Sequence, residues 1–171
     1  MNKSFQEGFA LIEEIRASLK NSLQTKVIIA PPNLLLEKAT ELGVTEIQPV
    51  IMERCVKRTL NIERCQKIVI SSAKQCRRSR FPLLKEPLDL DTFLTHRNGK
   101  IICGHMNSEK TLSQLNLVSD DHITVLIGPE GDFTENEMEK MKDVGVLFFN
   151  LGERRLRAET AALNTLSVLN E

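Results

Sequence analysis

The 171-residue sequence predicts an α/β domain with a mostly parallel sheet flanked by helices. Short apolar runs alternate along the chain with stretches of helical periodicity. Two of the runs, Lys100–Gly104 and Ile123–Gly128, are bounded by turn residues, as buried parallel strands are. The length suits one domain with a real core, and the hydrophobic fraction of 41% is ordinary for a globular protein.

The first half of the chain carries the signals of three helices. Residues 4–23 start with a capping box and continue with an apolar stripe, which predicts an amphipathic helix. Gly43 is placed to end a helix over Leu34–Leu42, as a C′ glycine does. Asn61–Ser79 is helical by period, with cations on the side opposite its apolar face. The strands expected between these helices are Val27–Ala30 and Thr45–Met52.

The second half repeats the alternation. Pro82 and Pro87 mark a connecting stretch, after which the two compact strands follow. Thr134 and Glu137 have the spacing of a capping box and begin a helix. The last elements expected are a strand over Val146–Asn150 and a helix from about Glu159.

Charge and composition exclude several classes of protein. The formal net charge is zero, so a nucleic-acid contact must come from a local patch. No apolar run approaches the ~20 residues that cross a bilayer, and no signal pattern begins the chain, so we expect a cytoplasmic location. The four cysteines and three histidines lack metal-ligand spacing, so we expect reduced thiols and no metal.

Three glycine-containing segments follow the last three predicted strands. They begin at Gly104, at Gly128 and at Leu151. Ligands of parallel α/β sheets bind beyond the carboxyl ends of the strands, and glycine lets a ligand approach the backbone. These glycines are too sparse for a dinucleotide fingerprint, and no P-loop sequence occurs. On spacing alone, the Gly128–Gly131 segment is more often only a turn.

Five motifs occur in order and together resemble one family. They are Lys38–Val44, Glu53-Arg54, Gln75–Arg78, Ile127–Gly131 and Leu151–Ala161. The ordered set, over roughly residues 26–171, resembles the methyltransferase domain of ribosomal RNA small subunit methyltransferase E, in the SPOUT class. The resemblance implies an S-adenosylmethionine-dependent homodimer with a trefoil knot. It also implies methylation of N3 of a uridine in 16S ribosomal RNA.

The resemblance also implies the cofactor site. The knot loops would be Gly128–Gly131 and Leu151–Arg157, and Glu159 would begin the threaded C-terminal helix. The expected cofactor-binding residues are Gly104, Ile127, Gly128, Pro129, Glu130, Gly131, Leu151, Gly152, Leu156, Arg157, Glu159, Thr160 and Ala161.

Arginines are the expected catalytic groups. Methylation of a uridine at N3 requires loss of a proton, and negative charge then develops on O2 and O4. A planar guanidinium suits those acceptors, so the candidates are Arg154, Arg157 and Arg78. Arg157 could instead pair with Glu159 or a helix carbonyl. Glu130 could be a base or, as is more common for such a residue, could shape the loop.

A basic segment is the candidate RNA contact. It contains Lys74, Arg77, Arg78 and Arg80. Charge runs are usually solvated helix faces, but the resemblance favours contact with the phosphates of 16S ribosomal RNA or the small ribosomal subunit.

The sequence departs from the family pattern at several places. The PUA-like barrel that usually comes first is not expected in the residues before Val27, which read as a helix over 1–25. Ala30–Asn33 replaces a Lys-Gly-x-Arg stretch, Asp132 stands where a second glycine is usual, and Arg155 replaces an isoleucine. Two hypotheses follow: an active uridine methyltransferase, or a catalytically weak or inactive knotted remnant that binds RNA or cofactor without turnover.

Overall fold

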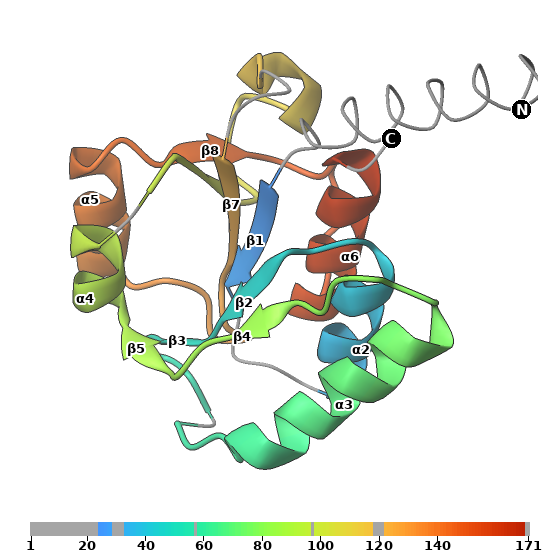
Figure 1. Ribbon diagram of the computed structural model, residues 1–171. Coiled ribbons are helices and arrows are strands. Elements are labelled where there is room, and N and C mark those ends of the chain that lie inside the picture. The colour runs from blue at the N-terminus through green and yellow to red at the C-terminus, as the bar shows by residue number, and fades with distance from the viewer. Residues whose placement is uncertain (1–23, 29–32, 57, 97, 118–121, 170–171) are drawn as a thin grey trace, which may run out of the picture.

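Parallel strand pairing organises the computed structural model, which describes residues 24–28, 33–56, 58–96, 98–117 and 122–169 (Figure 1). Within these residues, six strands form one sheet in the order β4-β2-β1-β7-β6-β8, and β3 pairs with β5 in a second. Every strand pair is parallel. The strands are β1 Gln24–Ile28, β2 Glu46–Gln48, β3 Val50–Ile51, β4 Leu83–Leu84, β5 Leu88–Asp89, β6 Lys100–Gly104, β7 His122–Ile127 and β8 Leu147–Phe149.

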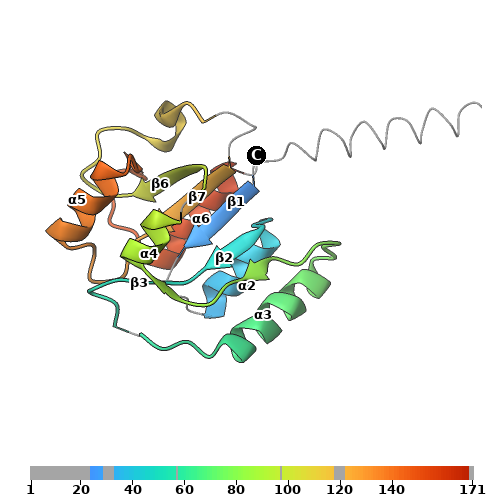
Figure 2. The ribbon, with the colours of Figure 1, turned by 60° about the vertical axis from the view of Figure 1, so that its left-hand side comes forward.

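Helices cover both faces of the six-stranded sheet. The α-helices are α2 Asn33–Glu41, α3 Ile62–Gln75, α4 Leu90–Thr95, α5 Glu135–Asp143 and α6 Ala158–Leu169, with a 3-10 turn η1 at Leu112–Leu115. Figures 1 and 2 show α2, α3 and α6 on one side and α4 and α5 on the other. The predicted α/β class with a mostly parallel sheet is therefore confirmed. The threading of the chain through a knot stays a prediction.

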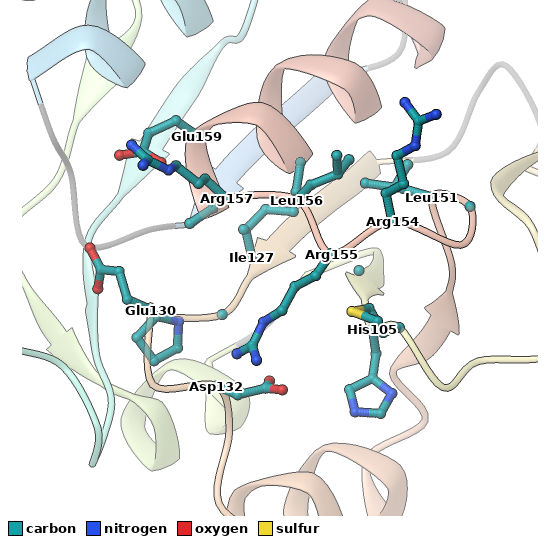
Figure 3. Close-up of a pocket in the computed structure, with 17 residues that line it drawn as sticks. His105, Ile127, Glu130, Asp132, Leu151, Arg154, Arg155, Leu156, Arg157 and Glu159 are labelled. Atoms are coloured by element: carbon teal, nitrogen blue, oxygen red, sulfur yellow. The ribbon is translucent and has the colours of Figure 1, made fainter.

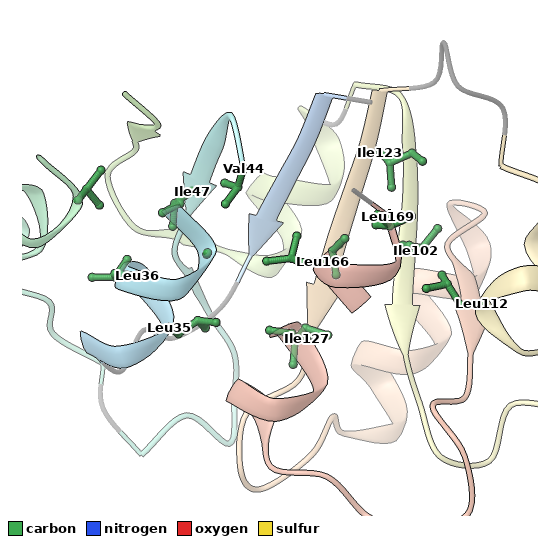
Figure 4. Packing of buried hydrophobic residues seen from close by; sticks show 14 of the residues in the cluster. Leu35, Leu36, Val44, Ile47, Ile102, Leu112, Ile123, Ile127, Leu166 and Leu169 are labelled. Carbon is green, nitrogen blue, oxygen red and sulfur yellow. The ribbon is translucent and has the colours of Figure 1, made fainter. Parts of the chain in front are cut away.

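Two apolar clusters fill the layers between sheet and helices. Alternate residues of β6 point to opposite faces, so Ile102 joins one cluster while Ile101 and Cys103 join the other. The first cluster packs Leu35, Leu36 and Leu166 between α2, α6 and the sheet (Figure 4). The second packs Leu94 of α4 and Met141 of α5. Both faces are buried, which explains why these strands read as continuous apolar runs.

Most predicted elements are found within two residues of their expected bounds. The exceptions are β1, which begins three residues before the expected Val27, the strand that proline interrupts, and a helix that ends early. The helix expected over residues 4–23, and Ala30, lie outside the described residues. No described helix is long and apolar enough to cross a membrane.

The prediction of one strand over Thr45–Met52 is wrong, because Pro49 divides it. Proline has no backbone N–H and cannot donate to a ladder. β2 before it pairs with β1 and β4, whereas β3 after it pairs with β5. The carbonyl of Pro49 still accepts a bond from the N–H of Leu88 at 3.1 Å. The stretch between Pro82 and Pro87, expected as a connection, contributes the short strand β4.

The prediction that a helix continues to Ser79 is also wrong, since α3 ends at Gln75. Arg77 has φ 57°, the left-handed conformation. Its N–H donates to the Lys74 carbonyl at 3.2 Å, and the N–H of Arg78 donates to Ala73 at 2.9 Å. This is the hydrogen-bond pattern of a Schellman cap, which normally uses glycine.

Two further helices end in the same way with the expected glycine. Gly43 follows α2 with φ 92°, and Gly145 follows α5 with φ 81°. Their N–H groups donate back to Thr40 and Lys142. The backbone of Arg77 thus adopts a conformation that costs a non-glycine residue about 1 kcal/mol.

We expect Arg77→Gly to raise the free energy of unfolding by about 1 kcal/mol, because glycine adopts this conformation without strain. Gly145→Ala is the matched control: an added Cβ there meets no atom within 4 Å, so the substitution tests φ alone. It should lower stability by about the same amount. Chemical denaturation of both variants measures this, and an unchanged midpoint for Arg77→Gly would contradict the assignment of strain.

Candidate functional site

A pocket of about 570 Å³ lies beyond the carboxyl ends of β6, β7 and β8. The register of these strands places Gly104 beside both Ile127 and Phe149, so the three strands end at one level. The loops that follow therefore converge with the start of α6 (Figure 3). The lining residues are Gly104, His105, Met106, Ile127, Gly128, Pro129, Glu130, Asp132, Leu151, Gly152, Arg154, Arg155, Leu156, Arg157, Ala158, Glu159 and Ala161.

The first loop, which follows β6, is fixed to β8 by hydrogen bonds. The His105 N–H donates to the Phe149 carbonyl at 2.8 Å, and the Ser108 hydroxyl donates to Phe148 at 2.9 Å. The Asn150 side-chain amide donates to the Ser108 carbonyl at 2.6 Å. Hydrogen bonds to β8 and to Asn150 consequently hold the pocket wall formed by Gly104 and His105 in place.

The second loop, residues 128–133, requires its glycines because other groups approach their backbone closely. A Cβ on Gly128 would lie 2.8 Å from the Phe133 ring, and one on Gly131 would lie 2.9 Å from the Cβ of Arg54. The Asp132 N–H donates to the Pro129 carbonyl at 2.9 Å and closes a turn. These contacts keep the loop backbone open toward the pocket.

The Glu53-Arg54 motif and Glu137 hold this second loop through hydrogen bonds. The Arg54 guanidinium donates to the carbonyls of Gly131 at 3.2 Å and Phe133 at 3.3 Å. The buried Glu137 carboxylate accepts from the Glu53 N–H at 2.8 Å and from the Thr134 N–H at 2.8 Å. The predicted capping box is therefore present, and its carboxylate also ties a distant segment to the loop.

The third loop carries the three arginines. Gly152 has φ 106° and donates its N–H to the Asn150 side chain at 3.3 Å. Figure 3 shows the Arg154 side chain turned away from the pocket and Arg155 extending across it toward Asp132. Arg157 lines the pocket on the side of Glu159, but among the described residues no ion pair joins the two. The structural role considered for Arg157, an ion pair with Glu159, is therefore not found.

The structure separates the expected cofactor residues into two groups. Those that line the pocket are Gly104, Ile127, Gly128, Pro129, Glu130, Leu151, Gly152, Leu156, Arg157, Glu159 and Ala161. Gly131 and Thr160 do not line it, although Gly131 packs against Arg54 behind the loop. The lining residues that the expected cofactor set omitted are His105, Met106, Asp132, Arg154, Arg155 and Ala158. Each stands within or beside one of the three expected loops, and Asp132 and Arg155 are also departures from the family pattern.

Arg78 lies outside the pocket lining. Its guanidinium donates to the carbonyls of Thr40 at 2.8 Å, Val44 at 2.9 Å and Gly43 at 3.3 Å. Burial lowers the pKa of Arg78, but an arginine stays charged under these conditions. The side chain thus caps the carboxyl end of α2, and this geometry gives no support to the expected catalytic role.

The cysteines do not contribute reactive groups to the pocket. All four are free, and Cys103 lies fully buried in β6. Burial raises the pKa of the Cys103 thiol, and the nearby Asp132 carboxylate raises it further, so the thiol is neutral. Across the described part of the chain, no group of three or more His, Cys, Asp or Glu side chains could hold a metal ion.

We expect Glu137→Ala to lower the free energy of unfolding by about 2 kcal/mol, because two part-buried N–H groups lose a charged acceptor. Glu139→Ala, an exposed carboxylate in the same helix, is the control and should change stability by less than about 0.5 kcal/mol. Chemical denaturation measures the stability of both variants. Equal midpoints would show that the bonds from Glu137 to Glu53 and Thr134 do not stabilise the fold.

Comparison with protein families identifies one match. The model of the RNA methyltransferase domain matches residues 20–170. Ribosomal RNA small subunit methyltransferase E of Rickettsia conorii is 33% identical over 138 residues, covering 78% of this chain and 57% of that protein. The Aquifex aeolicus protein of the same name is 30% identical, with 79% and 60% covered. The chain thus spans little more than half the length of these relatives.

Solved structures share the fold. A ribosomal RNA small subunit methyltransferase E from Neisseria gonorrhoeae, bound to S-adenosylmethionine, has a TM-score of 0.79 and 31% identity, covering 86% of this chain and 65% of that one. A putative methyltransferase from Legionella pneumophila, in complex with the same cofactor, has a TM-score of 0.77 and 30% identity, with the same coverage. The match over residues 20–170 shows that this chain belongs to the RNA methyltransferase domain family.

Proposed function

We propose that this chain is an S-adenosylmethionine-dependent methyltransferase, with residues 26–171 as its catalytic domain, that methylates N3 of a uridine in 16S ribosomal RNA. The observation that carries the proposal is the pocket where three glycine-containing loops meet α6. Two solved structures at about 30% identity bind S-adenosylmethionine, and the curated relatives are named for a ribosomal RNA methyltransferase. The proposal includes a homodimer, a cytoplasmic location and a knotted chain.

The residues of the pocket fit the proposed cofactor. A volume of about 570 Å³ lies within the usual range for small-molecule sites. Ile127, Leu151, Leu156 and Ala161 supply apolar surface for the adenine ring. The backbone at Gly152, where no Cβ intervenes, can hydrogen-bond the polar edges of the ligand. When bound, S-adenosylmethionine supplies a methyl group on a sulfonium.

The charged groups at the pocket suit methylation of a uridine nitrogen. As the N3 proton leaves, negative charge grows on the two neighbouring carbonyl oxygens, and a fixed guanidinium stabilises it. Arg157 lines the pocket without an ion-pair partner in the described structure, whereas Arg154 turns outward. We therefore assign charge stabilisation to Arg157.

Glu130 is the proposed proton acceptor. Its carboxylate is exposed at the pocket. Within the described residues its side chain forms no hydrogen bond that would shape the loop, whose turn is closed by backbone groups instead. Of the two roles that the sequence left open, the geometry favours the base.

RNA contact is assigned to Lys74, Arg77 and Arg80, whose side chains are exposed. Residues 74–80 contain four lysines and arginines and no acidic residue, in a chain of zero net charge. This segment precedes β4, so it leads into the amino end of the parallel sheet, opposite the pocket. We propose that it binds RNA phosphates away from the reacting base.

The function is tested by calorimetry with S-adenosylmethionine and by mass analysis of 16S ribosomal RNA from a strain lacking the gene. We expect the added protein to methylate one uridine. Arg157→Ala should lower the rate constant by roughly 10²-fold while the protein remains folded, because a charge-stabilising donor is lost. Lys142→Ala, which removes an exposed cation outside the pocket, is the control and should change the rate little. Full turnover by Arg157→Ala would refute its role, and cofactor binding without any turnover would favour an inactive remnant.

The RNA contact is tested by the salt dependence of binding to small-subunit RNA. Arg80→Ala should weaken binding and reduce the slope of log K against log salt by about 1, because one phosphate contact is lost. Lys142→Ala, an exposed cation on α5, is the control and should leave the slope unchanged. Binding that ignores salt would remove the basic segment from the proposal.

A further inference from the structure

Two charged residues face each other across the pocket, and neither belongs to the expected cofactor set. Arg155 comes from the loop after β8, and Asp132 comes from the loop after β7. Figure 3 shows the guanidinium of Arg155 extending toward the Asp132 carboxylate. Both side chains are exposed at the pocket. Among the described residues no ion pair joins them, so a gap separates the two charges.

The local fold does not account for the charge of Asp132. Its φ of 61° requires a residue that tolerates the left-handed conformation, and asparagine does so as well as aspartate. Its Oδ1 accepts the Phe133 N–H at 2.9 Å, which an amide oxygen would also do. The negative charge is therefore free to act on whatever occupies the pocket.

The local fold does not account for Arg155 either. The described structure gives its side chain no hydrogen-bond or ion-pair partner, although a guanidinium offers five N–H donors. The side chain of its neighbour Arg154, which also lines the pocket, extends in another direction and not toward Asp132. Arg155 instead crosses the pocket to the opposite loop.

An opposed cation and anion match one chemical group of the proposed cofactor. An α-amino acid carries a carboxylate and an ammonium on the same carbon, so its complement is a guanidinium and a carboxylate separated by a gap. We propose that Arg155 binds the carboxylate, and Asp132 the ammonium, of the amino-acid end of S-adenosylmethionine. This inference rests on the proposed function and adds two cofactor-binding residues to it.

The test compares two neutral thioethers that differ in the group at issue. S-Adenosylhomocysteine carries the amino-acid end, and 5′-methylthioadenosine lacks it. Calorimetry measures the affinity of each ligand for the full chain and for Arg155→Gln, Asp132→Asn and Lys142→Gln. Asp132→Asn keeps the turn and the bond to Phe133. Lys142→Gln removes an exposed cation that does not line the pocket and is the control. Thermal unfolding without ligand checks that each variant is folded.

We expect Arg155→Gln and Asp132→Asn each to lower the affinity for S-adenosylhomocysteine about tenfold, because each variant loses one charge-assisted hydrogen bond. Affinity for 5′-methylthioadenosine should stay within about twofold of the unmodified chain, and Lys142→Gln should leave the affinity for both ligands unchanged. Equal weakening of both ligands, or no weakening of either, overturns the assignment. Failure of the unmodified chain to bind S-adenosylmethionine and S-adenosylhomocysteine would instead contradict the proposed function itself.

Discussion

The parallel register of β6, β7 and β8 is the constraint on which the site depends. Gly104 is the register partner of both Ile127 and Phe149, so three strands far apart in sequence end side by side. In a parallel sheet every following loop must then leave at the same edge. The pocket forms because the three strands end together. The apolar side chains of β6 alternate between the two helical layers, and their packing fixes the register of the strand.

Support from behind lets the pocket loops expose their backbone. The Gly128 and Gly131 positions are crowded by Phe133 and Arg54, not by anything in the pocket. Arg54 and Glu137 supply hydrogen bonds to the loop backbone from the side opposite the pocket. The polar groups that face the pocket are consequently free for a ligand, while the loop stays ordered by bonds that a ligand does not disturb.

The elements that sequence reasoning predicted well are those whose signal is local. The capping box at Thr134, the glycine after α2 and the apolar runs of β6 and β7 each depend on neighbouring residues, and each is found. The division of a strand at Pro49 was missed because the apolar pattern continues through the proline. The contact of Arg78 with the end of α2 and the residues that follow it was missed, because these partners lie more than 30 residues earlier in the chain. Periodicity does not indicate which strands pair on either side of Pro49, or which carbonyls Arg78 binds.

The arginine run after β8 shows how geometry divides residues that sequence treats alike. Arg154 faces solvent, Arg155 crosses to Asp132, and Arg157 lines the wall beside the start of α6. Basicity alone would assign all three to RNA. The pocket lining also contains three carboxylates, Glu130, Asp132 and Glu159, and this mixture of charges suits a zwitterionic ligand better than a polyanion. The basic segment lies at the other end of the sheet, next to β4. The proposed cofactor and phosphate sites thus lie on separate surfaces, so we expect that substitutions in one surface need not impair the other.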